Sequence, residues 1–287
     1  MAGLKPWQLR DRWFDWGQRT YLMGILNVTP DSFSDGGQYN SLTAALTQAQ
    51  TLVQAEMDLL DIGGQSTRPQ AIEISVEEEL ARVIPVIKAI RQALDIPISI
   101  DTTRSDVATA AITAGADLVN DVSGGTADPE MFATVAALQV PIVLMHRRGT
   151  PETMQQLTDY TDLVGEIKQF FVHQIEAAER VGIKREAIAL DPGIGFAKTA
   201  EQSLELLRQL GEFRQLGCPL LVGPSRKSFM AKILNQPEPK QRVWGTAAAC
   251  CGAIAAGADL LRIHDGAEMR DVCRVADAIW RPSQPTA

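Results

Sequence analysis

Short apolar runs alternate with amphipathic stretches along most of the chain. The runs are rich in Leu, Ile and Val, which is typical of parallel strands that are buried on both faces. The stretches between them repeat apolar residues at helical spacing, so that in the segment 41–56 one stripe holds Leu42, Ala45, Leu46, Ala49, Leu52 and Val53. The runs predict strands over 21–27, 59–62, 97–101, 118–121, 141–145, 188–191, 219–222 and 260–264.

The amphipathic stretches predict a helix after each strand. These helices are expected over 41–56, 76–94, 105–114, 129–138, 161–181, 203–216, 243–256 and 267–280. About eight βα units in strict alternation predict an α/β protein that folds as a single (β/α)8 TIM barrel. A doubly wound open sheet is the runner-up. It is disfavoured because no G-x-G-x-x-G follows the first strand, and the late Gly193-Ile194-Gly195 lacks the third glycine.

Three regions are expected along the chain. Residues 1–20 form a short N-terminal extension, and we expect its aromatic residues to cover the bottom of the barrel: Trp7, Trp13, Phe14 and Trp16. Residues 21–281 form the barrel, and residues 282–287 form a flexible tail.

Composition restricts the class of partner and the compartment. The net charge of −8 argues against nucleic acid or an anionic membrane as the main partner. No apolar run approaches the length of a membrane span, and the first residues carry no apolar signal core. The four cysteines lack C-x-x-C spacing, which favours free thiols in a reducing compartment. The chain is therefore expected to be soluble and cytoplasmic, with no nucleic-acid or membrane partner.

Polar residues recur at the carboxyl ends of the predicted strands. Because side chains alternate along a strand, Ser99 and Asp101 share one face, and Arg262 and His264 share another. Any single one of these residues is as readily explained as a cap or turn residue. Together they indicate one site for a polar, partly anionic ligand, and the set is Asn27, Asp101, Asn120, Asp191, Lys227, Arg262 and His264.

Motifs along the whole predicted barrel resemble those of dihydropteroate synthase. They are NVTPDSFSDGG at 27–37, DIGGQSTRP at 61–69, SIDTTR at 99–104, NDVSGG at 120–125, LDPGIGFAK at 190–198, GPSRKS at 223–228 and RIHD at 262–265. The departures from the usual family pattern are mild and lie at Gln65, Gln70, Arg147, Arg148 and Gly266.

The resemblance implies a transferase that condenses 6-hydroxymethyl-7,8-dihydropterin diphosphate with 4-aminobenzoate in folate synthesis, and it implies roles for individual residues. The pterin would contact Asp101, Asn120, Asp191, Lys227, Arg262 and Met145. The diphosphate would lie near Asn27, Thr67, Arg68, Arg262 and His264, with Mg²⁺ as cofactor on Asn27. The aminobenzoate would lie among Phe33, Pro69, Phe196 and Ser228, which makes the protein a sulfonamide target. The catalytic residues would be Asp101, Lys227, Arg262 and Asn27, and the family further implies a homodimer through late helices such as 243–256.

The chemistry that the resemblance implies needs no protein nucleophile. A dissociative step would leave a positive charge on the pterin methylene, and Asp101 would stabilise that charge. Two alternatives stay open at this point: a pterin-binding methyltransferase barrel, and a pterin-binding paralogue without turnover. The STRP loop and the SRKS segment, which a methyltransferase would not need, disfavour the first. The second is disfavoured by an intact set of Asn27, Arg68, Lys227, Arg262 and His264.

Overall fold

The computed structural model describes residues 4–29, 37–68 and 71–281, and a parallel sheet of eight strands lies at its centre. The strands follow the order β8-β7-β6-β5-β4-β3-β10-β9. Their bounds are Tyr21–Asn27 (β3), Leu59–Gly63 (β4), Ile98–Asp101 (β5), Leu118–Asp121 (β6), Ile142–Met145 (β7), Ile188–Asp191 (β8), Leu221–Val222 (β9) and Leu260–Ile263 (β10). An isolated bridge between Leu190 and Leu220 joins the two end strands. The sheet therefore closes into a barrel.

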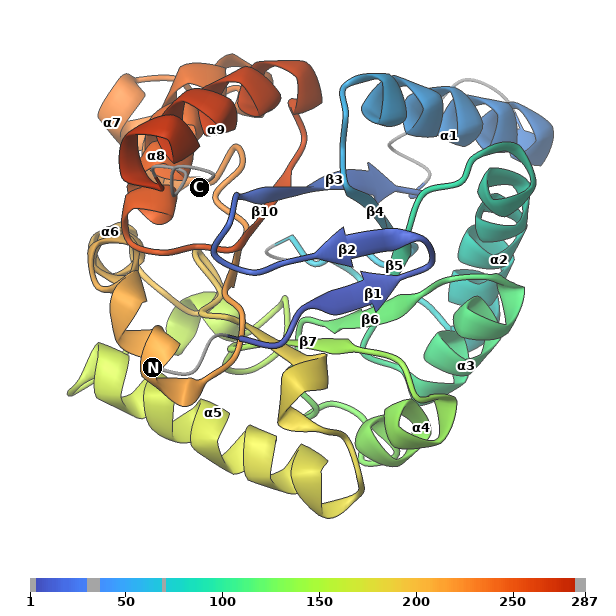
Figure 1. Ribbon diagram of the computed structural model, residues 1–287, viewed down its shortest axis with the longest axis horizontal. Coiled ribbons are helices and arrows are strands. Elements are labelled where there is room, and N and C mark those ends of the chain that lie inside the picture. The colour runs from blue at the N-terminus through green and yellow to red at the C-terminus, as the bar shows by residue number, and fades with distance from the viewer. Residues whose placement is uncertain (1–3, 30–36, 69–70, 282–287) are drawn as a thin grey trace, which may run out of the picture.

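Helices connect successive strands and surround the barrel (Figure 1). They are α1 (Gly37–Gln54), α2 (Val76–Ala93), α3 (Ser105–Ala114), α4 (Met131–Leu138), α5 (Leu163–Arg180), α6 (Ala200–Arg208), α7 (Phe229–Leu234), α8 (Val243–Ala255) and α9 (Gly266–Trp280). The predicted (β/α)8 barrel is confirmed.

Three helical segments differ from the sequence-based expectation. The helix predicted over 41–56 begins at Gly37 and ends at Gln54. The helix predicted over 203–216 begins earlier, because Thr199 and Gln202 form a capping box, and α6 ends at Arg208. A separate 3₁₀ helix, Leu210–Leu216, follows it and contains Gly211, a poor residue for a helix interior. The short helix α7 follows GPSRKS and was not predicted, because six residues are too few to show a helical period.

Side chains that alternate between the two faces of each strand form two separate hydrophobic cores, one outside the barrel and one inside it. Outward side chains such as Ile100, Leu144 and Leu261 belong to the larger core between the sheet and the helices. Inward side chains near the starts of the strands form a second core, which includes Met23, Leu59, Leu118, Val143, Ala189, Leu221 and Leu260. Polar side chains replace apolar ones further along the same inward faces, at Asp61, Asp101, Asn120 and Asp191.

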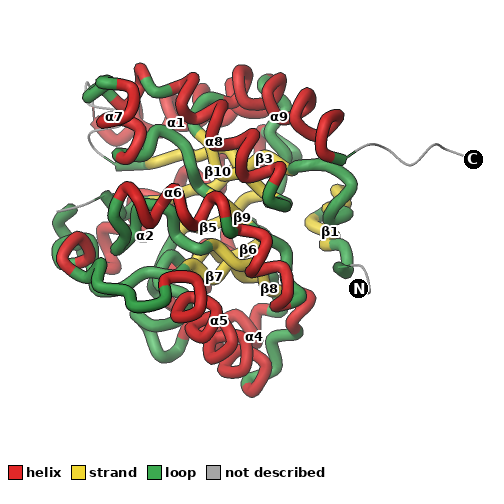
Figure 2. Tube along the Cα trace, turned by 90° about the vertical axis from the view of Figure 1, so that its left-hand side faces the viewer, coloured by secondary structure: helices red, strands yellow, loops and turns green. Residues whose placement is uncertain are grey.

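An N-terminal hairpin packs on this second core. Strands β1 (Trp7–Leu9) and β2 (Arg12–Phe14) pair antiparallel, and the ring centroids of Phe14 and Tyr21 lie 4.8 Å apart. Figure 1 looks onto this end of the barrel, with the hairpin in the foreground, and Figure 2 shows β1 beside the barrel. Of the four aromatic residues expected to cover the bottom of the barrel, Trp7, Phe14 and Trp16 pack in this core. The side chain of Trp13 points outward and is 59% exposed. The hairpin closes the barrel at the starts of the strands, which leaves their carboxyl ends for a functional site.

Two remaining expectations concern the chain end and membranes. Residues 282–287, predicted as a flexible tail, lie outside the described residues. Within the described ranges, no helix combines the length and apolar character that crossing a membrane requires.

Candidate active site at the strand ends

Four inward residues from four strands form one hydrogen-bonded network inside the barrel. Arg262 donates from Nε to Oδ2 of Asp61 (2.5 Å) and from NH2 to Oδ2 of Asp101 (2.8 Å). Asn120 donates from Nδ2 to the same Oδ2 of Asp61 (3.1 Å). Gly63 is the register partner of Asp101, and a Cβ at Gly63 would lie only 3.4 Å from the Cβ of Asp101. A glycine there leaves room beside the carboxylate.

Burial and mutual charge set the protonation of this network. Burial raises the pKa of Asp101 to about 7, although the charge of Arg262 opposes the rise. Burial by itself lowers the pKa of Arg262, but the charges of Asp61 and Asp101 outweigh it and the pKa is raised. Arg262 is therefore a permanent cation, whereas Asp101 titrates near neutral pH, so the charge of a bound ligand can decide its state.

A second acid–base pair lies at the ends of β8 and β9. Asp191 accepts a hydrogen bond from the backbone N–H of Gly193 (2.8 Å), and burial raises its pKa. Lys227 follows β9; burial lowers its pKa to about 8, and the charge of Asp191 limits the fall. Met145 is the register partner of Asp191 on β7. We call Asp101, Asn120, Asp191, Lys227 and Arg262 the strand-end site.

The loop after β8 brings an aromatic ring to this site. The Nζ of Lys227 lies 4.1 Å from the ring centroid of Phe196, a cation–π contact. Gly195 has a φ of +81°, and a Cβ there would lie 3.4 Å from Cδ of Lys227. A glycine at this position satisfies both the backbone conformation and the close approach.

Lys198 anchors the loop that carries Phe196, a role that the sequence analysis did not predict. Its buried Nζ lies 2.9 Å from Nδ1 of His146 and donates to the carbonyl oxygen of Phe196 (2.9 Å). Burial, with the charge of Lys198 adding to it, lowers the pKa of His146 to about 2. His146 is thus a neutral acceptor that fixes a buried lysine, and the pair supports the loop that carries Phe196.

The residues predicted to hold the diphosphate lie at the same end of the barrel. Asn27 ends β3, and Thr67 and Arg68 lie in the loop after β4. His264 follows β10, and its Nδ1 lies 2.9 Å from Oγ of Ser225. Burial lowers the pKa of His264 to about 3, with nearby arginines adding to the effect. His264 therefore offers a hydrogen bond to an anion rather than a positive charge.

Gln65, a departure from the usual family pattern, ties down the loop that carries Thr67 and Arg68. Its Nε2 donates to the carbonyl oxygen of Ile72 (3.0 Å), and its Oε1 accepts from the backbone N–H of Ile74 (2.9 Å). Since a carboxylate only accepts hydrogen bonds, a glutamate at this position could not reproduce both contacts. Gln70, the other departure in this loop, lies outside the described residues.

The predicted aminobenzoate residues are only partly described. Phe33 and Pro69 lie outside the described residues. Phe196 is half-buried against Lys227, and Ser228 is exposed directly before α7. Because α7 spans only six residues, its dipole adds little to any anion site at Ser228.

The side chain of Asn27 offers an oxygen donor of the kind that Mg²⁺ binds. Within residues 4–29, 37–68 and 71–281, no group of three or more His, Cys, Asp or Glu side chains could hold a metal ion. One amide oxygen is a weak ligand alone, but Mg²⁺ prefers oxygen donors and often keeps phosphate and water in its shell. The residues present therefore fit Mg²⁺ that shares its ligands with a bound diphosphate.

Asp61 is the network residue that the sequence-based site set omitted. It lies in the middle of β4, is fully buried, and belongs to the quoted motif DIGGQSTRP. Strand alternation was the available signal, because Leu59, Asp61 and Gly63 share the inward face. The ion pair with Arg262 spans 201 positions in the sequence, which explains why local patterns did not reveal it.

Comparisons with known proteins agree with this geometry. Residues 23–264 match the family described as pterin binding enzyme. The chain is 63% identical to the dihydropteroate synthase of Synechocystis sp. over 93% of each chain. It also resembles the dihydropteroate synthase of Clostridium difficile, whose crystal structure was determined in the presence of pteroic acid (47% identity, TM-score 0.89, 93% of this chain and 99% of that chain). A dihydropteroate synthase of Yersinia pestis with a sulfonamide drug is similar as well (42% identity, TM-score 0.90, 96% of this chain and 99% of that chain). Matched over nearly its whole length, this chain belongs to the dihydropteroate synthase family.

Proposed function

We propose that this chain condenses 6-hydroxymethyl-7,8-dihydropterin diphosphate with 4-aminobenzoate, giving 7,8-dihydropteroate and diphosphate for folate synthesis. The observation that carries the proposal is the strand-end site, which joins three acceptor side chains to two cationic ones within a closed barrel. Membership of the dihydropteroate synthase family supports the same reaction. The methyltransferase and the non-catalytic paralogue have no comparable support.

The pterin ring requires the chemistry that these residues offer. The amino and N–H groups of the ring are donors, and Asp191 and the amide oxygen of Asn120 can accept from them. Lys227 can donate to the ring carbonyl and N5. Arg262 donates to Asp61 and Asp101 from N–H groups that lie in the plane of its guanidinium, so its flat faces remain for stacking on the ring. Met145 supplies an apolar contact.

In the proposed mechanism, the carbon–oxygen bond between the pterin methylene and the diphosphate breaks first. The electron pair leaves with the diphosphate, near Asn27, Thr67, Arg68 and His264. The positive charge left on the pterin spreads over the ring, and the carboxylate of Asp101 stabilises it. The neutral amine of aminobenzoate then forms the carbon–nitrogen bond and releases a proton to solvent. Mg²⁺ held by Asn27 and the diphosphate would neutralise charge on the leaving group.

A diphosphate-release assay with both substrates tests the proposed function. We expect release to require both the pterin diphosphate and aminobenzoate. A sulfonamide should inhibit competitively and be relieved by excess aminobenzoate, because it copies the aromatic amine and its para anion. The similar Yersinia pestis enzyme was solved with such a drug. A chain that binds pterin but releases no diphosphate would be the non-catalytic paralogue instead.

The pKa values of Asp101 and Lys227 predict a narrow pH optimum. Asp101 must be ionised, so kcat/KM should rise with pH through about 7; Lys227 must be protonated, so kcat/KM should fall above about 8. Initial rates measured at low substrate concentration across this pH range give both the acid limb and the basic limb of the kcat/KM profile. Lys227→Arg should remove the basic limb, because arginine stays protonated. A wild-type profile that is flat from about pH 6 to about pH 9 would contradict both assignments.

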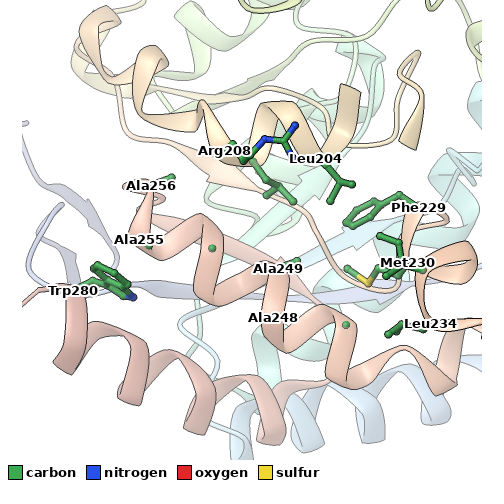
Figure 3. A pocket seen from close by; sticks show the side chains of 14 residues that line it. Leu204, Arg208, Phe229, Met230, Leu234, Ala248, Ala249, Ala255, Ala256 and Trp280 are labelled. Atoms are coloured by element: carbon green, nitrogen blue, oxygen red, sulfur yellow. The ribbon is translucent and has the colours of Figure 1, made fainter. Parts of the chain in front are cut away.

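We further propose that the chain forms a homodimer through α7, α8 and α9. An apolar groove of about 670 Å³ lies among helices α6 to α9 (Figure 3), with side chains of Phe229, Met230 and Leu234 on one side. Ile233 and Trp280, which also line the groove, are 62% and 57% exposed, and Trp244 at the start of α8 is 76% exposed. Exposed apolar side chains gathered at an apolar groove are typical of a protein interface. A second copy of the chain, which would place the same patch of each subunit against the other, would bury these side chains.

Sedimentation tests the homodimer with a matched pair of tryptophans. Trp244→Glu should shift the protein from dimer to monomer, because a charge would be buried at the interface. Trp13→Glu, at the exposed tryptophan of the N-terminal hairpin, should leave the dimer unchanged. A wild-type protein that sediments as a monomer at micromolar concentration would exclude this interface.

A cytoplasmic location is proposed on the state of the cysteines. All four are free thiols, and Cys218, Cys250 and Cys273 are buried. Burial raises the pKa of Cys218 to about 12, which makes that thiol unreactive. Free, buried thiols suit a reducing compartment.

A further inference from the structure

We propose that Asp61 is a positioning residue that orients both Asn120 and Arg262 toward the pterin ring; this inference rests on the proposed function. On β4, Asp61 is the inward-facing residue that directly precedes Gly63, two positions earlier in the sequence. Its side chain is fully buried, so it reaches the ligand through its two partners.

The orientation of Asn120 follows from what a carboxylate can do. Oδ2 of Asp61 accepts from Nδ2 of Asn120 (3.1 Å), and an ionised carboxylate has no proton to donate. The NH₂ end of the Asn120 amide must therefore point at Asp61. Its oxygen is left as an acceptor, which is the group that the donor edge of a pterin requires. A neutral amide in place of Asp61 would allow Asn120 to turn over and present the wrong atom.

The same oxygen fixes the plane of Arg262. Oδ2 of Asp61 accepts a hydrogen bond from Nε of Arg262 (2.5 Å), and Oδ2 of Asp101 accepts one from NH2 (2.8 Å). Two acceptors on two N–H groups of a rigid, planar group fix its orientation. Stacking on a flat ring depends on that plane, so Asp61 acts on the ligand through Arg262 as well as through Asn120.

Stability alone does not explain a carboxylate at this position. Among the residues that the structure describes, the other oxygen of Asp61, Oδ1, is buried and has no hydrogen-bond partner, and the same holds for Oγ of Ser99, its register partner on β5. A buried polar atom without a partner destabilises a fold. An ion pair inside a protein is often no more stabilising than apolar residues of the same shape. The geometry points to a role in the site.

Asp61 also acts on Asp101 through its charge. After burial and the opposing charge of Arg262, the charge of Asp61 is the next contribution to the raised pKa of Asp101. Removing that charge should let Asp101 ionise at lower pH. Asp61 thus affects both the orientation of the binding groups and the pH at which the site is active.

Asp61→Asn tests the proposal by calorimetry with 6-hydroxymethyl-7,8-dihydropterin and by the pH dependence of kcat/KM. We expect pterin affinity to fall about 10- to 100-fold, KM for aminobenzoate to stay within about twofold, and the acid limb to move to lower pH. Asp259→Asn is the matched control, because Asp259 is another buried aspartate that pairs with an arginine, Arg214, at the opposite end of the barrel. It should lower the melting temperature and leave pterin affinity and the acid limb unchanged.

Two outcomes overturn the inference. One is a folded Asp61→Asn protein with wild-type pterin affinity and an unmoved acid limb. If Asp61→Asn does not fold, Asp61→Glu decides: it keeps the charge but displaces it by one methylene, so the acid limb should stay while pterin affinity falls about tenfold or more. Unchanged affinity in Asp61→Glu would also overturn it. Wild-type protein that fails to bind pterin would instead remove the proposed function, so the two failures are distinguishable.

Discussion

Asp191→Ala is expected to reduce pterin affinity by about 100-fold or more. Asp191 is buried at the end of β8, where its carboxylate accepts a hydrogen bond from the backbone N–H of Gly193. The positive charge of Lys227 also acts on this carboxylate. Without it, donors on the pterin edge would be removed from water and left unpaired, and a hydrogen bond to a charged group is worth more than one between neutral groups. Lys227 would also lose the negative charge that limits the fall of its pKa.

Calorimetry with 6-hydroxymethyl-7,8-dihydropterin measures this loss directly. Asp117→Ala provides the control, because Asp117 is a partly buried carboxylate that accepts from the backbone N–H of Ile98 (2.8 Å) and pairs with Arg91 at the starts of the strands. The control should lower the melting temperature without changing affinity. An Asp191→Ala protein that binds pterin as tightly as the wild type would remove Asp191 from the site.

Asp101→Asn is expected to lower kcat by about 100-fold or more while pterin affinity changes only a few-fold. The two residues have nearly the same shape, and the amide oxygen can still accept from NH2 of Arg262. The negative charge is lost, and that charge matters most when the pterin methylene becomes cationic. Burial raises the pKa of Asp101 to about 7, so in the unliganded protein this carboxyl group is only partly ionised near neutral pH.

Single-turnover kinetics and calorimetry separate the two effects of this substitution. The acid limb of the pH profile should also disappear, because asparagine does not titrate. Equal losses in turnover and affinity would make Asp101 a binding residue and would argue against the dissociative step.

The barrel could be predicted because its strands are short apolar runs and its helices carry a clear stripe of apolar residues at helical spacing. The alternation that separates Ile100 from Asp101 predicts the polar, inward ends of the strands, and the structure brings Asp101, Asn120 and Arg262 together there. The resemblance to dihydropteroate synthase added the substrates, which alternation alone does not identify.

Features that depend on contacts between distant residues could not be predicted. The hairpin strands β1 and β2 are three residues each, too short to show a period, and the hairpin is held by rings such as Phe14 against Tyr21. His146 and Lys198 follow the neighbouring strands β7 and β8, and their contact joins residues 52 positions apart. Asp61 and Arg262 lie on β4 and β10. At these separations, sequence spacing carries no signal. The sequence shows Gln65 only as a departure from the family pattern, whereas its hydrogen bonds to Ile72 and Ile74 give a physical reason for an amide at this position.

A crystal structure with 6-hydroxymethyl-7,8-dihydropterin diphosphate and an aminobenzoate analogue tests the central claim most directly. The account predicts the pterin ring at the strand-end site, with Asp191 and the amide oxygen of Asn120 on its donor edge. Arg262 should stack on its face, and the diphosphate should lie beside Asn27 and His264. A pterin bound in the groove among α6 to α9, or at the strand ends without contact to Asp191 and Arg262, would contradict the account.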